Sequence, residues 1–205
     1  MCRIATALCA LLLIPLTPST AWANPPGMPT VIEAQTELAA LEIADETHAD
    51  TYDRRKFPHW STASGQCNTR ETVLIRDGQS VVTDAACSPI SGSWYSPYDG
   101  VTWTQASDLD IDHMVPLKEA WRSGAWSWTT ERRKAFANSL SDTQLWAVTD
   151  NVNQGKGDQD PSSWRPPLAS FTCEYARSWI DVKHDWGLTA QPAERTALAE
   201  MLATC

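Results

Sequence analysis

The stretch of sequence that decides the fold is Asp108-Leu109-Asp110-Ile111-Asp112-His113-Met114-Val115-Pro116-Leu117. Acidic and aliphatic residues alternate along it, a period typical of a β strand with one polar face. Asp108, Asp110 and Asp112 are therefore expected to point the same way, and His113 begins a break in the alternation. Carboxylates gathered on one face repel one another unless a cation or water separates them. The pattern predicts a strand that carries a cation site.

Oxygen atoms of carboxylates and carboxamides are the ligands that hard cations such as Mg²⁺ or Mn²⁺ prefer. Asp112, together with an asparagine from a later segment, would form part of a shell that water and phosphate oxygens complete. His113 beside it could deprotonate a water molecule. Two other interpretations are open from these residues alone: the acids as a solvated strand edge, and the histidine as a structural residue.

Two later segments favour the catalytic interpretation, Gln144-Leu145 and Asn153-Gln154-Gly155-Lys156-Gly157-Asp158. With Asp112-His113-Met114-Val115-Pro116 they resemble the ββα-metal signature of HNH endonucleases. In that family an Asp-His-Ile/Val-x-Pro element ends the first strand, and an Asn followed by a Lys opens the helix that completes the motif. The resemblance implies that Asp112 and Asn153 bind the metal and that His113 is the general base.

The sequence departs from the family pattern at Gln144, which stands where an asparagine is expected before the second strand. The group that orients His113 is therefore open between Gln144, Asn151 and a backbone carbonyl.

The resemblance extends over most of residues 50–205. The segments that carry it are Tyr52 to Trp60, Cys67 to Leu74, the Asp-His element, Asn153 to Asp160, and Trp164. They are similar to exported actinobacterial and fungal HNH proteins, which are related to the C-terminal domain of GmrSD-type modification-dependent restriction enzymes. The fold implied is α+β: a ββα-metal (HNH/His-Me finger) core at about residues 101–165, with flanking helices and an extra β-hairpin, in a nuclease domain at 51–205.

Candidate contacts to a substrate phosphate are Lys156, three residues after Asn153, and Arg70, with Arg54 or Arg55 as further phosphate clamps. A solvent-exposed loop lysine and an Arg–Glu ion pair are the alternatives for Lys156 and Arg70. Asp158 is expected to be structural, through bonds to backbone amides or Lys156.

Residues 1–23 have the pattern of a secretory signal peptide, with Arg3, an apolar run and a cleavage site after Ala23. Export as a soluble protein is therefore predicted, with residues 24–50 as a linker and helix before the nuclease domain. Four cysteines remain after cleavage, and in an exported chain an even set predicts disulfides. Three pairings are possible, of which Cys67–Cys87 with Cys173–Cys205 is local in sequence; a zinc site is the alternative, but no paired Cys/His spacing supports it.

Periodicity and turn residues predict the remaining elements. Helices are expected at residues 31–41, 117–121, 130–137, 173–186 and 193–202, and strands at 101–104 and 144–148. Residues 71–76 and 80–83, separated by Asp77-Gly78, are expected to form a β-hairpin. Residues 88–100 and 149–161 have the composition of loops.

The composition excludes a partner held by a broad cationic surface, because 16 Lys and Arg against 25 Asp and Glu give a formal charge of −9. Eleven tryptophans are the one outlier, and most of them are expected in the core. The function predicted is a secreted metal-dependent endonuclease that hydrolyses phosphodiester bonds of DNA with low sequence specificity. RNA is left open as a second substrate. No membrane and no obligate protein partner are expected.

Two alternatives from other classes are kept. One is a secreted glycoside hydrolase with Asp108 or Asp110 as acid and Asp112 as base, its tryptophans stacking on sugars. The other is a non-catalytic binding module stapled by two disulfides.

Overall fold

The computed structural model describes residues 24–205, so the predicted signal peptide lies outside the described residues. The helices are α1 Val31–Ala40, α2 Thr69–Asp77, α3 Leu117–Arg122, α4 Thr130–Ala137, α5 Asp150–Lys156, α6 Thr172–Trp186 and α7 Pro192–Leu202. The strands are β1 Thr62–Ser64, β2 Cys67–Asn68, β3 Gly78–Thr83, β4 Pro89–Tyr95, β5 Thr102–Trp103, β6 Leu109–His113 and β7 Leu145–Thr149. The α+β class predicted from the sequence is confirmed.

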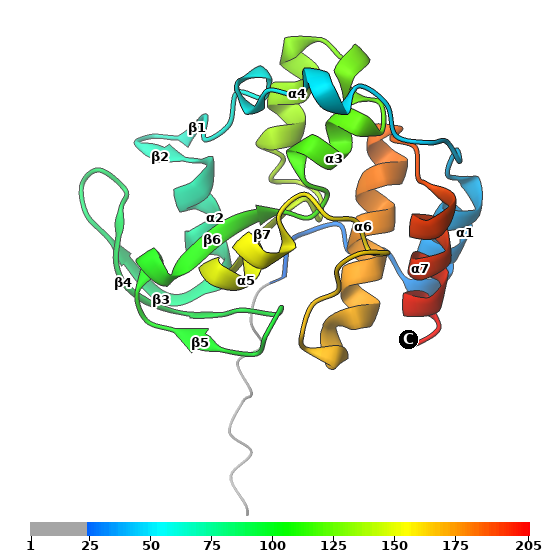
Figure 1. Cartoon of the computed structure of the whole chain (residues 1–205). Helices are drawn as coiled ribbons and strands as arrows, with labels where there is room; N and C mark the ends of the chain where they lie inside the picture. Colours follow the sequence, from blue (N-terminus) through cyan, green and yellow to red (C-terminus); the bar gives the residue numbers. More distant parts are fainter. Residues whose placement is uncertain (1–23) are drawn as a thin grey trace, which may run out of the picture.

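The antiparallel pair β6–β7 lies at the centre of the fold, and α5 follows β7 directly (Figure 1). In its register Asp112 is opposite Trp146 and His113 is opposite Leu145. Side chains alternate between the two faces of a strand. Leu109 and Ile111 pack on one face against Val73 of α2, whereas Trp146 and Val148 join the larger core formed with the C-terminal helices. The strand pair is therefore buried on both faces.

The stretch predicted as a hairpin at 71–83 is instead a helix followed by a strand, which corrects the sequence prediction. Asn68 caps α2: its side chain accepts from the Glu71 amide at 3.1 Å, and the Glu71 carboxylate accepts from the Asn68 amide at 2.8 Å. Such a capping box stabilises a helix start. Residues 78–83 pair with β4, in a region expected to be a loop, and β5 completes this three-stranded sheet.

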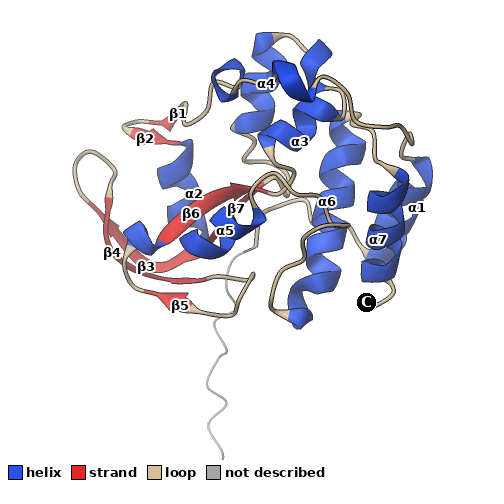
Figure 2. Cartoon of the chain, viewed as in Figure 1, coloured by secondary structure: helices blue, strands red, loops and turns tan. Residues whose placement is uncertain are grey.

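The C-terminal helices form one side of the molecule, with α1 packed against α6 and α7 (Figure 2). Lys183 of α6 is completely buried there, and its ammonium contacts Glu119 at 2.8 Å and Glu194 at 2.7 Å. Two carboxylates and one further backbone acceptor, Thr189 O, satisfy the buried charge. This ion cluster joins α3, α6 and α7. α6 ends at Gly187, which has φ +63° and so takes the left-handed conformation that glycine permits.

Both disulfides have the pairing that is local in sequence. Cys67–Cys87 joins β2, just before α2, to the turn between β3 and β4, and Cys173–Cys205 joins the first turn of α6 to the segment after α7. Within residues 24–205, no helix is both long and apolar enough to cross a membrane.

Candidate active site

A cleft of about 340 Å³ opens where the end of β6 meets α5 and the segment around residue 52. Its walls include the following residues: Tyr52, Arg54, Asp112, His113, Lys118, Asn153, Gln154 and Asp158. The structure thus brings together the three residues that the sequence predicted for catalysis and metal binding. Tyr52 and Arg54 come from a segment more than fifty residues before β6, and Lys118 comes from α3.

His113 is held by a backbone carbonyl. Its Nε2 lies 2.9 Å from the oxygen of Ala137, at the end of α4. Because a carbonyl oxygen only accepts, Nε2 carries the proton of the neutral ring and Nδ1 keeps the lone pair. Burial lowers the pKa of His113 to about 3, and the hydrogen bond to Ala137 opposes this in part. The imidazole is therefore neutral near pH 7, with one nitrogen able to accept a proton.

Neither side chain suggested for orienting His113 contacts it in the described chain. Gln144 instead clamps Val115, accepting from its amide at 3.1 Å and donating to its carbonyl at 2.9 Å. Asn151 is exposed on the first turn of α5. The third alternative, a backbone carbonyl, is the one that the structure shows.

Asp112 is almost fully buried and forms an ion pair with Lys156 of α5. The Lys156 ammonium lies 2.5 Å from Oδ2 of Asp112, and the Tyr98 hydroxyl donates to the same oxygen at 2.5 Å. Burial raises the pKa of Asp112 and lowers that of Lys156, and their mutual attraction opposes both shifts. The carboxylate is thereby fixed in one orientation at the base of the cleft.

Lys156 is not placed to contact a phosphate, which corrects the sequence prediction. Its side chain is 0 % exposed. Besides Asp112, its ammonium donates to the carbonyls of His113 and Met114, each at 2.9 Å. All three N–H groups are thus used inside the protein. Lys156 fastens α5 to the end of β6 and fixes the backbone of the residue that follows Asp112.

Asn153 lies on α5 beside the acids of β6. Its Nδ2 donates to Asp110 Oδ2 at 3.0 Å, so its oxygen is the acceptor that remains. Asp108 is absent from this group, because it belongs to a 3-10 helix at Ala106–Asp108 that precedes β6. The expected face of three acids is therefore a pair, Asp110 and Asp112.

The donor chemistry of the cleft fits a hard cation held by few protein atoms. Across the described chain, both hydrogen bonds to the Asp112 carboxylate use Oδ2, which leaves Oδ1 as a ligand atom. Asn153, in the same cleft, keeps its side-chain oxygen as a second one. Oxygen donors of this kind suit Mg²⁺ or Mn²⁺. Residues 24–205 contain no cluster of three or more His, Cys, Asp or Glu side chains suited to a metal ion. Water and substrate oxygens would have to complete the shell.

The arginines are placed differently from one another. Arg70 donates through Nη2 to the carbonyls of Ala106 at 3.1 Å and Leu109 at 3.0 Å, so it holds the start of β6 rather than lining the cleft. Arg55 forms an ion pair with Asp53 at 2.6 Å. Arg54 is exposed and lines the cleft. It is the arginine in position to meet an anion beside His113.

Asp158 is structural, as expected, but with other partners. It pairs with Lys118 and with Arg122, each at 2.8 Å. These contacts tie the segment after α5 to α3. The sequence analysis missed Tyr98, Ala137 and Lys118, and no local signal could have found them, since each meets the site only through the tertiary fold.

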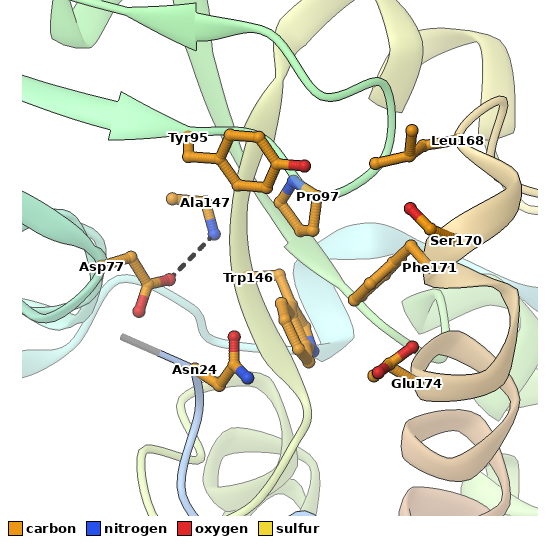
Figure 3. Close-up of a pocket in the computed structure, with 10 residues that line it drawn as sticks. All are labelled: Asn24, Asp77, Tyr95, Pro97, Trp146, Ala147, Leu168, Ser170, Phe171 and Glu174. Atoms are coloured by element: carbon orange, nitrogen blue, oxygen red, sulfur yellow. Dashed lines mark hydrogen bonds between the residues drawn. The ribbon is translucent and has the colours of Figure 1, made fainter. Parts of the chain in front are cut away.

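A second cavity, of about 260 Å³, lies along the outer edge of β7 (Figure 3). Trp146 and Phe171 give it an apolar wall, and Asp77 there accepts from the Ala147 amide at 3.1 Å. It shares no lining residue with the cleft of His113. The Asp77 contact satisfies an edge of β7 that pairs with no further strand within residues 24–205.

Comparison with known proteins gives two matches. The family model described as "GmrSD restriction endonucleases, C-terminal domain" matches residues 75–201. A protein of Arthroderma benhamiae named "Uncharacterized secreted protein" is 58 % identical over 182 residues, which are 89 % of each chain. The prediction of secretion is confirmed by this relative. No solved structure matches the chain.

Proposed function

Since the chain belongs to the family of the GmrSD restriction endonuclease C-terminal domain, we propose that it is a secreted, metal-dependent endonuclease of the HNH type. Its substrate is a nucleic acid, with DNA as the first choice, and its reaction is hydrolysis of a phosphodiester bond. Membership of this family supports a nuclease-related function. The HNH type, the metal dependence and the DNA substrate are proposed from the residues of the cleft.

One observation carries the proposal. His113 shares a cleft with Asp112 and Asn153 at the end of a strand–strand–helix unit, β6–β7–α5. Its neutral ring carries the proton on Nε2, which donates to the Ala137 carbonyl. The order of this unit, two strands and then a helix, supports the ββα arrangement that the sequence motif implies. A neutral imidazole next to two oxygen donors is the set of groups needed to activate water beside a cation.

In the proposed reaction, Nδ1 of His113 accepts a proton from the water whose oxygen bonds to phosphorus, as the bond from phosphorus to the leaving sugar oxygen breaks. The leaving oxygen takes its proton from solvent. Ala137 holds the other ring nitrogen and stabilises the imidazolium that forms. Burial is the main cause that lowers the pKa of His113 in the free protein, and the charge of Arg54 lowers it further. A bound phosphate would offset the charge of Arg54 and make His113 a stronger base.

Asp112 and Asn153 would hold a divalent cation, which supplies neutralising charge at the phosphate and at the leaving oxygen when it is bound. Lys156 and Tyr98 keep Oδ2 of Asp112 occupied, so the carboxylate would offer Oδ1. The chain's part is to present these oxygens in a fixed orientation.

The proposed binding is weak and largely independent of base sequence. Arg54 and Lys118 are the cationic side chains exposed in the cleft, and Lys118 is already paired with Asp158. Each phosphate contact adds to the salt dependence of nucleic-acid binding, so few contacts mean a shallow dependence. An overall charge of −9 limits retention elsewhere on the surface.

The test is digestion of supercoiled plasmid by the secreted, processed protein with Mg²⁺, with Mn²⁺ or with EDTA, beside His113→Ala. We expect cutting that needs the metal and is lost in the variant. Parallel reactions with single-stranded RNA decide whether RNA is a second substrate. Full activity in EDTA, or undiminished cutting by His113→Ala, would exclude the proposed mechanism.

A further inference from the structure

Trp60 occupies a backbone conformation that a bulky residue rarely adopts. Its φ is +56°, in the left-handed region, where side chains other than those of Gly, Asn and Asp are disfavoured. Strain of this kind persists only where the surrounding structure imposes it, and it is frequent beside functional groups. The Trp60 ring lies against His113, with the ring centroids 5.8 Å apart and the planes at 34°.

The side chain of Asn138 is bonded to the backbone on both sides of Trp60. Its oxygen accepts from the Ser61 amide at 2.9 Å, and its Nδ2 donates to the Pro58 carbonyl at 2.8 Å. Asn138 thus grips the chain on both sides of Trp60. Nδ2 also donates to the Lys134 carbonyl at 2.7 Å, which fixes the side chain to the last turn of α4.

Asn138 also follows Ala137 directly in the chain, and the Ala137 carbonyl is the group that holds Nε2 of His113. The two contacts that position the imidazole, the carbonyl on one nitrogen and the indole beside the ring, therefore come from one local structure. On the basis of the proposed function, we propose that Trp60 and Asn138 are positioning residues for His113, with Asn138 setting both contacts at once.

This role predicts an effect on turnover and little effect on binding. Among the residues described, neither Trp60 nor Asn138 lines the cleft, so we expect both to act on the reaction through His113. A displaced general base lowers the rate of the chemical step, and an ångström of misplacement can cost about a hundredfold. We expect kcat to fall by about tenfold or more, with KM within about twofold.

The variants separate ring, backbone and hydrogen bonds. Trp60→Gly relieves the left-handed conformation but removes the ring, whereas Trp60→Phe keeps an aromatic ring in place. Asn138→Asp keeps the shape but turns the donor to Pro58 and Lys134 into an acceptor. Trp126→Phe and Asn151→Asp are the matched controls, since both residues are exposed and outside the cleft.

We expect low kcat in Trp60→Gly and Asn138→Asp, recovery in Trp60→Phe, and wild-type turnover in both controls. In the double variant Trp60→Gly/Asn138→Asp, kcat should fall by a smaller factor than the product of the two single reductions, because both residues act through His113. A cooperative thermal unfolding transition, measured for each variant, is the control that the variant is folded.

A second readout needs no activity. The ¹⁵N shifts of the His113 ring, measured at one fixed pH on the metal-free protein, report which nitrogen carries the proton. We expect the Nε2–H form in the wild type and a mixture of tautomers in Asn138→Asp. If the wild type cuts no nucleic acid, the proposed function fails while this readout still tests the positioning. Wild-type ring shifts together with wild-type kcat in Trp60→Gly and Asn138→Asp would overturn the inference.

Discussion

The ammonium of Lys156 lies 2.5 Å from Oδ2 of Asp112, and the two side chains are 0 % and 6 % exposed. Removal of one partner from a buried ion pair leaves an uncompensated charge in the core. Lys156→Met should therefore lower the free energy of unfolding by about 3–5 kcal/mol, measured by urea denaturation. Lys118→Met is the control: its half-exposed pair with Asp158 should contribute less than about 1 kcal/mol. Equal losses of unfolding free energy in Lys156→Met and Lys118→Met would contradict the larger contribution expected of the buried pair.

Tyr98 supports the same carboxylate through a single hydroxyl. Tyr98→Phe removes the hydrogen bond to Asp112 and leaves the ring in place. A hydrogen bond to a charged group contributes about 1.5–3 kcal/mol, so a loss of this size is expected in chemical denaturation. A variant as stable as the wild type would mean that Lys156 alone satisfies Oδ2.

Arg54 and Arg55 form a natural pair of test and control, because only Arg54 lines the cleft. Arg54→Ala should raise KM for DNA several-fold. It should also reduce, by about one, the slope of the logarithm of the DNA-binding constant plotted against the logarithm of the salt concentration. Arg55→Ala should leave both unchanged. If the two variants behave alike, the positive charge of the segment matters and not the position of Arg54.

Asp181 gives stability a dependence on pH. Its pKa is raised to about 7, chiefly by burial, although Thr143 donates to it at 2.9 Å. An acid with a folded pKa above its unfolded value favours the folded state at low pH, and this advantage is lost as pH rises from about 4 to about 7. Asp181→Asn should therefore stabilise the protein at pH 8 by about 1–2 kcal/mol, after allowance for solvent screening, and have little effect at pH 4. A stabilisation that is the same at both pH values would exclude this origin.

The Cys173–Cys205 disulfide closes a loop across a sequence separation of 32 residues. In the chain-entropy model such a bridge stabilises the folded state by about 3–4 kcal/mol. Replacement of both cysteines by serine should lower the midpoint of thermal unfolding accordingly, measured with the other disulfide intact. Because neither Cys173 nor Cys205 lines the cleft, kcat at low temperature should not change.

The sequence predicted the elements whose signals are local. The helix of residues 173–186 ends at Gly187, and the alternation at 109–113 produces a strand, as expected. The prediction failed where two local signals competed. Val73 and Ile75 favour a strand, but the Asn68–Glu71 capping box and the packing of Val73 and Leu74 against the strand pair favour the helix that forms.

The site was predictable in its residue types but not in its contacts. The motif named Asp112, His113 and Asn153, which do share a cleft. It could not show that Lys156 turns inward, because the side chain's direction depends on the acceptors that β6 presents to α5. Nor could it show that Ala137, 24 residues away, holds His113.

The segment that carries Tyr52, Arg54 and Trp60 also bears on where the working unit begins. These residues precede the region that the family model matches, residues 75–201. Cys67 and Cys205 lie outside that region as well, so a chain trimmed to it would leave Cys87 and Cys173 as unpaired thiols. Expression boundaries drawn from the family match would thus remove one wall of the cleft and prevent both disulfides from forming. The smallest unit to produce extends from before Tyr52 to at least Cys205.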